Sequence, residues 1–421
     1  MAALLCAATA SERLGAHLCA QDWASRVVGV EGEPFSARLV AIDERWNITF
    51  AADDGDRALP ADDLVQWGSL RDSEKTLPVV LADGSLLSAE RVELVNGALV
   101  AHSKLLGPVR LPLDLVRGVV LRRSSEPLER DKLIERVLAA QGDEDQVFLL
   151  NGDVLRGTVS ADPDAELPTD ADPFSVRPLA LRVETRGGHV SLKSDQVSVM
   201  ALRASRRAEG ERGATTVLLG LADGSRLRAT GISAESQGKL EVRLACGATL
   251  ACDAAAFYKN VALIQPDSPR VVYLSDLKPL DYKHVPLLEL AWSYGANRNL
   301  LGGRLRSGGA IYERGLAMHS ASRLAYALPD GAKRFEAELA LDDSAGDRAS
   351  VGGSVEYRVY LQGRDGQWSE SYTSPIIRTG DPPLPISLDV TASRAIALLI
   401  GYADHGDTAD HANWLNARLI K

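Results

Sequence analysis

The stretch that decides the fold of the first part of the chain is VVLADGSLL, at residues 79–87. An apolar run is followed by Asp-Gly and then by a second apolar run. This pattern favours a β-hairpin, because both residues of a tight two-residue turn must adopt a positive φ. The same pattern recurs as VFLLNGDVL at residues 147–155 and as LGLADGSRL at residues 219–227. Three hairpins of one design predict a repeated all-β architecture.

Each hairpin is followed by a more variable strand pair and by an ending with an Asp that can cap a short 3₁₀ turn. These endings are LPADDLV at 59–65, LPLDLV at 111–116, VSLKSDQV at 190–197 and LACDAA at 250–255. The first of them reveals a degenerate copy without a hairpin signal. We therefore predict four β units, at residues 30–72, 76–122, 145–203 and 214–265. Their strand order resembles that of small five-stranded SH3-like or Sm-like barrels.

One helix is predicted between the second and third units, at residues 126–141. Apolar side chains recur there at helical spacing, at Leu133, Ile134, Val137 and Leu138. A connector docked on the neighbouring units and a helix that binds a partner are both compatible with this pattern.

The first residues and the cysteines bear on the cellular compartment. Residues 1–22 contain an apolar run with small residues at its end, which is similar to the core of a secretory signal, although a basic segment before it is missing. We expect export to the periplasm, the cell surface or the medium, with a frayed cytosolic terminus as the alternative. Cys246 and Cys252 flank a hairpin-like stretch and form either a disulfide or two buried thiols.

Charge and hydropathy exclude two classes of partner. The net charge is −10, and the first 270 residues hold 39 acidic against 31 basic residues. This balance repels phosphate backbones and argues against nucleic-acid binding. No apolar run reaches the length of a transmembrane helix. After residue 270 the composition changes, since the last 151 residues hold 13 of the 22 aromatic residues. Alternating strand patterns continue there and predict a β-sandwich.

Several motifs in this last part occur in a familiar order. They are YLSDL at 273–277, YERGLAMHSAS at 312–322, FEAELALDD at 335–343, DHGD at 404–407 and DHANW at 410–414. This order resembles the NPCBM domain, a carbohydrate-binding module found beside family-98 glycoside hydrolases. The resemblance implies a galactose-binding-like jelly roll at residues 271–421, binding of galactose-type glycans and a structural calcium. One departure is Asn413, where the family motif has Asp.

A sugar site combines an aromatic face for the pyranose ring with polar groups for its hydroxyls. The candidate ligand-binding residues are Trp292, Tyr312, His319, Asp342, Asp343, Asp410, His411 and Trp414. Asp342 and Asp343 are also the candidate calcium ligands. Structural roles are the alternatives: a buried imidazole for His319, core packing for Trp414, turn capping for the two adjacent carboxylates, and a hydrogen-bonded pair for Asp410 with His411.

We therefore expect non-catalytic glycan binding by the last module, with the β units as a spacer or scaffold. No catalytic residues are predicted, because the sequence has no nucleophile elbow, phosphate loop or His-Glu-x-x-His motif. Asp342 and Asp343 are adjacent and would point to opposite faces of a strand, which does not suit glycoside hydrolysis. A cell-surface protein-interaction scaffold without sugar binding and a glycosidase with an unrecognised site are the alternatives.

Overall fold

The computed structural model describes residues 25–421 except 74–75, 165–178, 204–214, 288–289, 347–351 and 405. The predicted leader at residues 1–22 therefore lies outside the described residues. Strands make up 56% of the structure, the sheets are antiparallel, and the described residues contain two α-helices. The predicted all-β class is confirmed. Neither of these two helices has the length and apolar composition that crossing a membrane requires.

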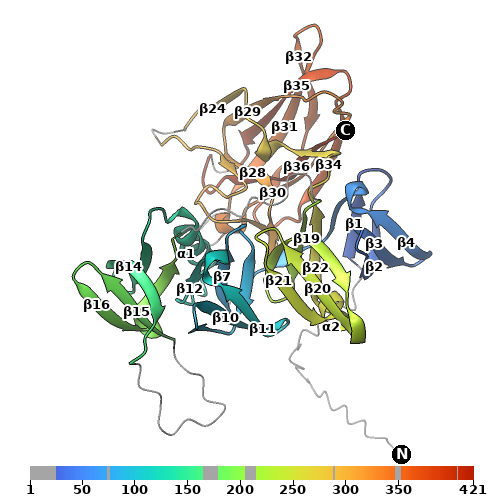
Figure 1. Cartoon of the computed structure of the whole chain (residues 1–421). Helices are drawn as coiled ribbons and strands as arrows, with labels where there is room; N and C mark the ends of the chain where they lie inside the picture. The colour runs from blue at the N-terminus through green and yellow to red at the C-terminus, as the bar shows by residue number, and fades with distance from the viewer. Residues whose placement is uncertain are drawn as a thin grey trace, which may run out of the picture.

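Four β units follow one another in the N-terminal region (Figure 1). The first contains β1 (Ser25–Gly29), β2 (Phe35–Ile42), β3 (Asn47–Ala52), β4 (Gly55–Pro60), η1 (Ala61–Asp63) and β5 (Leu64–Gly68). The second contains β7 (Leu77–Leu81), β8 (Leu86–Ala89), β9 (Arg91–Val95), β10 (Ala98–Ser103), β11 (Gly107–Pro112), η2 (Leu113–Leu115) and β12 (Val116–Val120). The third contains β13 (Asp145–Leu149), β14 (Val154–Ala161), β15 (Ala180–Thr185), β16 (Gly188–Lys193), η3 (Ser194–Gln196) and β17 (Val197–Ala201). The fourth contains β18 (Val217–Leu221), β19 (Arg226–Ala234), η4 (Ser236–Gly238), β20 (Lys239–Leu244), β21 (Thr249–Asp253), α2 (Ala254–Asn260) and β22 (Val261–Pro266).

The three predicted hairpins are present as β7–β8, β13–β14 and β18–β19. In the first of them Gly84 has φ +85° and its N–H donates to the carbonyl of Leu81. Asp83 does not have a positive φ, so the hairpin is present but its turn is not the expected type with positive φ at both central residues. In every unit the first strand also pairs with the last, so that β1 pairs with β5, β7 with β12, β13 with β17 and β18 with β22. The four units that the sequence predicted therefore share the same pattern of strand pairing.

The units do not separate into four independent sheets. β12 pairs with β17, β22 with β5 and β19 with β8, so each of these hydrogen-bonded ladders crosses from one unit to another. The result is one 18-stranded sheet, with β9, β10 and β11 forming a small sheet beside it. One apolar core runs through all four units, from Val27 to Ile264. The resemblance to separate small barrels is therefore not shown.

Two element boundaries differ from the prediction. The first unit begins at Ser25 rather than residue 30, because β1 pairs with both β2 and β5. The predicted turns are 3₁₀ helices in the first three units, but no Asp side chain caps them, so that part of the prediction is wrong there. The fourth unit forms the short helix α2, whose first turn is capped by the Asp253 carboxylate accepting the Ala256 N–H. Three consecutive alanines after the capping Asp favour this helix.

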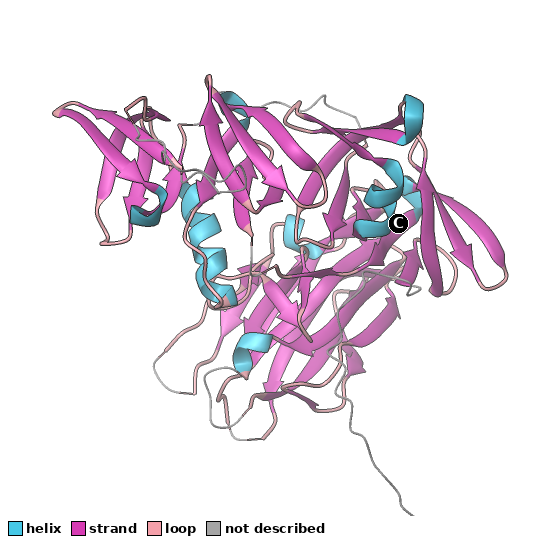
Figure 2. Cartoon of the chain, turned by 90° about the horizontal axis from the view of Figure 1, so that it is seen from below, coloured by secondary structure: helices cyan, strands magenta, loops and turns pink. Residues whose placement is uncertain are grey.

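The predicted connecting helix is confirmed as α1 (Pro127–Ala139), which lies across strands of the N-terminal region (Figure 2). Leu133, Ile134 and Val137 are buried against Val80, Val120 and Val199, which come from the second and third units. The helix is thus a docked connector along its apolar face. It also buries two charged residues, Arg130 and Asp131, whose partners lie outside the β units.

The two cysteines of the fourth unit are free thiols and not a disulfide. Cys246 lies in the turn after β20, while Cys252 lies within β21 opposite Leu240, so the two side chains do not face each other across the hairpin. Burial raises the pKa of the Cys246 thiol to about 12 and that of Cys252 to about 11. Both are therefore protonated, buried apolar groups.

The last part of the chain forms a β-sandwich of two six-stranded sheets. The first sheet contains β23 (Val271–Tyr273), β25 (Gly295–Ala296), β28 (Gly315–His319), β36 (His411–Ile420), β30 (Arg334–Leu341) and β34 (Leu384–Asp389). The second contains β24 (Asp281–His284), β29 (Ser322–Ala327), β35 (Ser393–Tyr402), β31 (Ser354–Gly363), β32 (Trp368–Thr373) and β33 (Ile377–Arg378). Short 3₁₀ turns are η5 (Leu274–Asp276) and η6 (Asp343–Ala345). Between the sheets lies a separate core whose largest side chains are Trp414, Tyr326, Tyr357 and Phe335.

The sandwich and the N-terminal region share a small sheet. β26 (Leu305–Ser307) and β27 (Ala310–Tyr312) of the sandwich form a hairpin, and β27 pairs with β6 (Leu70–Arg71), which directly follows the first unit. Leu70 and Ile311 are buried together with Leu263 of the fourth unit. The sandwich and the N-terminal region therefore each contribute a strand to one small sheet, and apolar side chains from both pack together beside it.

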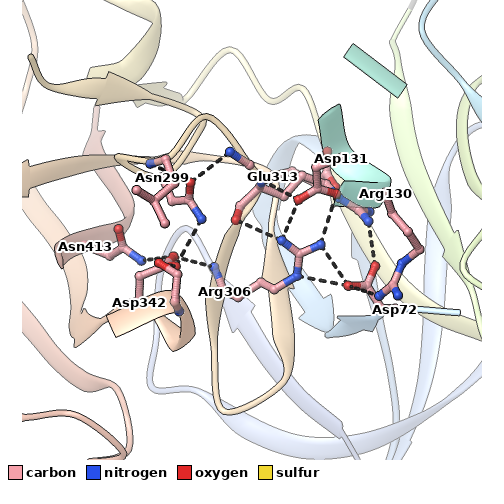
Figure 3. Close-up of polar contacts among 12 residues, drawn as sticks. Asp72, Arg130, Asp131, Asn299, Arg306, Glu313, Asp342 and Asn413 are labelled. Atoms are coloured by element: carbon pink, nitrogen blue, oxygen red, sulfur yellow. Dashed lines mark hydrogen bonds and ion pairs between the residues drawn. The ribbon is translucent and has the colours of Figure 1, made fainter. Parts of the chain in front are cut away.

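Beside this sheet lies a buried group of four charged side chains, which we call the interface ion network: Asp72, Asp131, Arg304 and Arg306 (Figure 3). Arg306 Nη1 lies 2.6 Å from Asp131 Oδ2, and its Nη2 lies 2.8 Å from Asp72 Oδ2. Arg304 Nε donates to Asp131 at 2.7 Å. The two carboxylates belong to the N-terminal region and the two guanidinium groups to the sandwich. Arg130 of α1 also lies 3.1 Å from Asp72, so Asp72 is neutralised both within the N-terminal region and across the junction, while the partners of Asp131 come from the sandwich.

Burial raises the pKa of Asp131, but the charges of Arg304 and Arg306 outweigh it and lower the pKa to about 2. The carboxylate is therefore ionised at neutral pH. A buried ion pair contributes little net stability, yet removing one partner leaves a largely buried charge short of its counter-charge. We therefore expect the loss of one member of the network to destabilise the junction.

Arg306→Met is expected to lower the free energy of unfolding of the full chain by about 3–5 kcal/mol, because Asp72 and Asp131 then share one guanidinium fewer. Arg378→Met is the matched control, since Arg378 pairs with Asp404 on the exposed surface, and it should cost less than about 1 kcal/mol. Urea denaturation followed by circular dichroism measures both. Equal effects of the two substitutions would show that the junction does not depend on the network.

Candidate functional site

Four ring side chains meet at one end of the sandwich, and we call them the Trp-His cluster: His284, Trp292, His319 and His411. His284 ends β24, His319 ends β28 and His411 begins β36. Trp292 lies in the segment before β25. His319 and His411 are directly opposite each other in the antiparallel pairing of β28 with β36. The strand ends therefore place the rings side by side.

The geometry of the cluster is that of a stack with two flanking rings. The Trp292 indole lies parallel to the His319 imidazole, with centroids 4.9 Å apart and an interplanar angle of 4°. His411 lies 5.8 Å from the Trp292 ring and 6.1 Å from His319. His284 meets His319 edge-on at 5.7 Å. His319 is buried, whereas Trp292 and His411 are partly exposed to solvent.

Backbone hydrogen bonds fix the two inner imidazoles. His319 Nδ1 lies 2.8 Å and His284 Nε2 3.0 Å from the carbonyl oxygen of Ser320, so both nitrogens carry a proton and donate. His284 Nδ1 accepts the N–H of Trp292 at 3.1 Å, which ties the Trp292 backbone to β24. Burial lowers the pKa of His319, so its imidazole is neutral at pH 7. Its Nε2 is then a hydrogen-bond acceptor.

Two buried carboxylates support the cluster from behind. Asp410 accepts the Ser320 hydroxyl at 2.6 Å and the Ser354 N–H at 2.9 Å. Asp342 accepts the Ser344 hydroxyl at 2.6 Å, and Ser344 Oγ lies 3.3 Å from His411 Nδ1. Both carboxylates thus hold the loops that carry the rings.

Five donors already point at the two oxygens of Asp342. They are Asn299 Nδ2, the N–H and the hydroxyl of Ser344, the Arg306 N–H and Asn413 Nδ2. Asp343 accepts the N–H groups of Gly308 and Gly309. Calcium needs six to eight oxygen ligands, and these carboxylates accept hydrogen bonds from N–H groups and from one hydroxyl instead. Within the described residues no group of three or more His, Cys, Asp or Glu is placed to hold a metal ion. The residues present around Asp342 and Asp343 do not fit the calcium site that the resemblance implied.

Asn413 explains part of this arrangement. Its amide nitrogen donates to Asp342 Oδ2 at 2.8 Å (Figure 3). The Asp of the family motif has no such donor, and two adjacent buried carboxylates would need a shared proton or a cation. Asn in place of Asp at position 413 therefore supplies a donor to the Asp342 carboxylate instead of a second negative charge beside it.

Three of the sequence candidates lie outside the cluster and its supporting carboxylates: Tyr312, Trp414 and Asp343, the last of which accepts the N–H groups of Gly308 and Gly309. Trp414 is fully buried between the sheets, where its ring lies edge-on to Tyr357 at 5.0 Å. Tyr312 lies on β27 at the junction and donates its hydroxyl to Glu338 at 3.3 Å. Side chains alternate along β36, so Trp414 faces the core while its neighbour Asn413 faces the junction. The structure thus brings together Trp292, His319 and His411, with Asp342 and Asp410 behind them.

Sequence reasoning missed His284, because no motif marks it. Its only signal is its place at the end of the alternating stretch Asp281–His284, which is β24. Strand pairing of His284 with Ser322 is what brings it to His319.

Asp410→Asn is expected to alter how stability depends on pH. Burial raises the pKa of Asp410 from 3.8 to about 6, so between these values the folded state holds a proton that the unfolded state has lost. The wild-type free energy of unfolding should therefore fall as the pH rises from about 4 to about 6, by about 1–3 kcal/mol. Asn has no ionisable proton and removes this fall. Urea denaturation at pH 4.5 and 7.5 tests it, and an identical pH dependence in both proteins would refute it.

The comparisons with known proteins concern mainly this part of the chain. The family profile of the NPCBM/NEW2 domain matches residues 270–420. A comparison with curated protein sequences gives no match.

Three solved structures are similar. The first is CBM51-2 with INT domains from Clostridium perfringens ZmpB in complex with GlcNAc, at 21% identity and a TM-score of 0.31, over 47% of this chain and 42% of that chain. The second is CBM51 from Clostridium perfringens GH95 in complex with methyl-galactose, at 18% and 0.30, over 35% and 99%. The third is the tandem CBM51 pair of the family 98 glycoside hydrolase from Streptococcus pneumoniae, at 12% and 0.31, over 82% and 88%. The match spans less than half of the first of these chains. On the family profile, residues 270–420 are an NPCBM/NEW2 domain, a carbohydrate-binding-module family with a β-sandwich fold.

Proposed function

We propose that residues 270–420 bind a glycan without cleaving it, and that the Trp-His cluster is the contact site. The observation that carries this proposal is the partly exposed indole of Trp292, held flat against His319 on the loops at one end of the sandwich. An aromatic ring with a fixed plane offers an apolar face to a pyranose ring. Its orientation costs nothing at binding because the stack already exists.

The polar groups beside Trp292 suit sugar hydroxyls. His319 is neutral and its Nδ1 proton is committed to Ser320, which makes Nε2 an acceptor. His411 adds a second, partly exposed imidazole 5.8 Å from the indole. Exposed apolar side chains on the neighbouring segment extend the rim, at Val285, Leu287 and Leu290. An aromatic face with two imidazoles and an apolar rim supports recognition of a neutral sugar.

The sugars to be tested first are chosen from the similar structures. One CBM51 structure is described in complex with methyl-galactose and another in complex with GlcNAc. We propose that a galactose-type residue is the ligand of this chain. We do not propose a calcium ligand set, and the binding experiment below is done both with calcium and with EDTA.

For the N-terminal region we propose a spacer or scaffold role in an exported protein. In support, its four units share one sheet and one apolar core, and the interface ion network joins them to the sandwich. Each unit closes its first strand on its last, as a small five-stranded barrel would. Such a region would hold the glycan-binding end at a fixed distance from whatever the N-terminus joins.

Trp292→Ala should weaken binding of methyl-galactoside by the full chain at least about tenfold, because it removes the face on which the sugar stacks. Trp368→Ala is the matched control, since it removes an exposed Trp elsewhere on the sandwich and should leave this affinity unchanged. Isothermal titration calorimetry with methyl-galactoside and GlcNAc, in calcium and in EDTA, measures both. Absence of binding under all these conditions, or equal losses in the two variants, would contradict the proposal.

A further inference from the structure

A second hollow lies on the outer face of the sheet β24–β29–β35–β31–β32, away from the Trp-His cluster. Figure 1 shows this sheet at the end of the molecule opposite to the four β units. The hollow has a volume of about 440 Å³, within the range of small-ligand sites. Its lining includes Trp368, which is 43% exposed, and Leu280, which is 62% exposed. These two exposed apolar side chains lie at opposite ends of one hollow, which is what gives the hollow apolar walls.

Strand register explains the shape of the hollow. On this face Ala325 lies opposite Ala397, and Ala397 lies opposite Tyr360. The two alanines are short and form a low floor over the central strands. Trp368 stands on one side, where it pairs with Gln362, and Leu280 stands on the other. A low floor between tall apolar walls is a groove that crosses the strands.

The groove is long in one direction. Its lining comes from all five strands, from Asp281 on β24 to Trp368 on β32. Five strands span four interstrand spacings, which is about 19 Å. That length suits a chain of linked sugar rings better than a single ring.

The polar groups of the groove are already paired with one another. Arg323 pairs with Asp281 at one end, and the Tyr360 hydroxyl donates to Glu370 at 2.6 Å near the other. Arg323 and Asp281 are the charged residues of the lining, and their charges cancel. The two pairs offer both donors and acceptors to sugar hydroxyl groups, and the lining itself carries no net charge.

We propose that this groove is a second carbohydrate site, which binds a neutral oligosaccharide with one ring against Trp368. The aromatic wall would contact the apolar face of a pyranose, and the paired groups would bind hydroxyls on either side. This site does not depend on the Trp-His cluster, because no residue is shared and the groove lies on a sheet face instead of the loop end.

The test uses the full chain and three neutral tetrasaccharides: cellotetraose, xylotetraose and β-1,4-galactotetraose. At least one should bind, and its affinity should fall at least tenfold in Trp368→Ala. Trp368→Phe, which keeps an aromatic face, should recover part of the loss. Ile376→Ala is the control, since it removes an exposed apolar side chain outside the groove and should leave tetrasaccharide binding unchanged. Circular dichroism confirms that each variant is folded, which the exposure of Trp368 leads us to expect.

Three outcomes would overturn the inference. One is that none of the tetrasaccharides binds at millimolar concentration, and another is that Trp368→Ala leaves their binding intact. The third is that the wild-type chain self-associates through this face, seen as a concentration-dependent sedimentation coefficient that Trp368→Ala abolishes. A loss of methyl-galactoside binding in Trp292→Ala alone, with no tetrasaccharide binding, would refute the groove and leave the proposed function standing.

Discussion

The interaction on which the rest of the structure depends is the buried pairing of Arg304 and Arg306 with Asp72 and Asp131. The two guanidinium groups of the sandwich find their carboxylates across the junction, and Arg130 pairs with Asp72 within the N-terminal region. The interface ion network therefore fixes how the sandwich sits on the N-terminal region and adds little to the free energy of unfolding. β6 and β27 must meet in register for the guanidinium groups to reach both carboxylates.

The same arginine links the junction to the candidate site. The Arg306 N–H donates to Asp342 at 3.1 Å, Asp342 accepts the Ser344 hydroxyl, and Ser344 lies beside His411. Asn413 completes this chain from β36. The loops that carry the rings are therefore anchored at their bases while Trp292 and His411 stay partly exposed. A binding site of this type combines rigid support with accessible rings.

How much could be predicted from the sequence differs between the fold and the site. Turn chemistry is local, so Asp83-Gly84 and its two copies predicted hairpins correctly, and helical spacing predicted α1. Pairing between units is not local: nothing in β12 marks β17 as its second neighbour, so the single sheet was not expected. The order of the motifs identified the domain, but it made both Trp414 and His411 candidate ligand-binding residues. Only the alternation along β36 separates a core indole from a ring at the strand end. His284 needed the pairing of β24 with β29, which no short motif encodes.

The central claim is that a sugar contacts Trp292 at the loop end of the sandwich. The most direct measurement is a ¹H–¹⁵N spectrum of the full chain recorded during titration with methyl-galactoside, with the indole and imidazole resonances assigned. The account predicts progressive shifts of the Trp292 indole and of the His319 and His411 rings, with the Trp414 indole unchanged because it is sealed in the core. Saturable shifts that leave these three rings unmoved would contradict it.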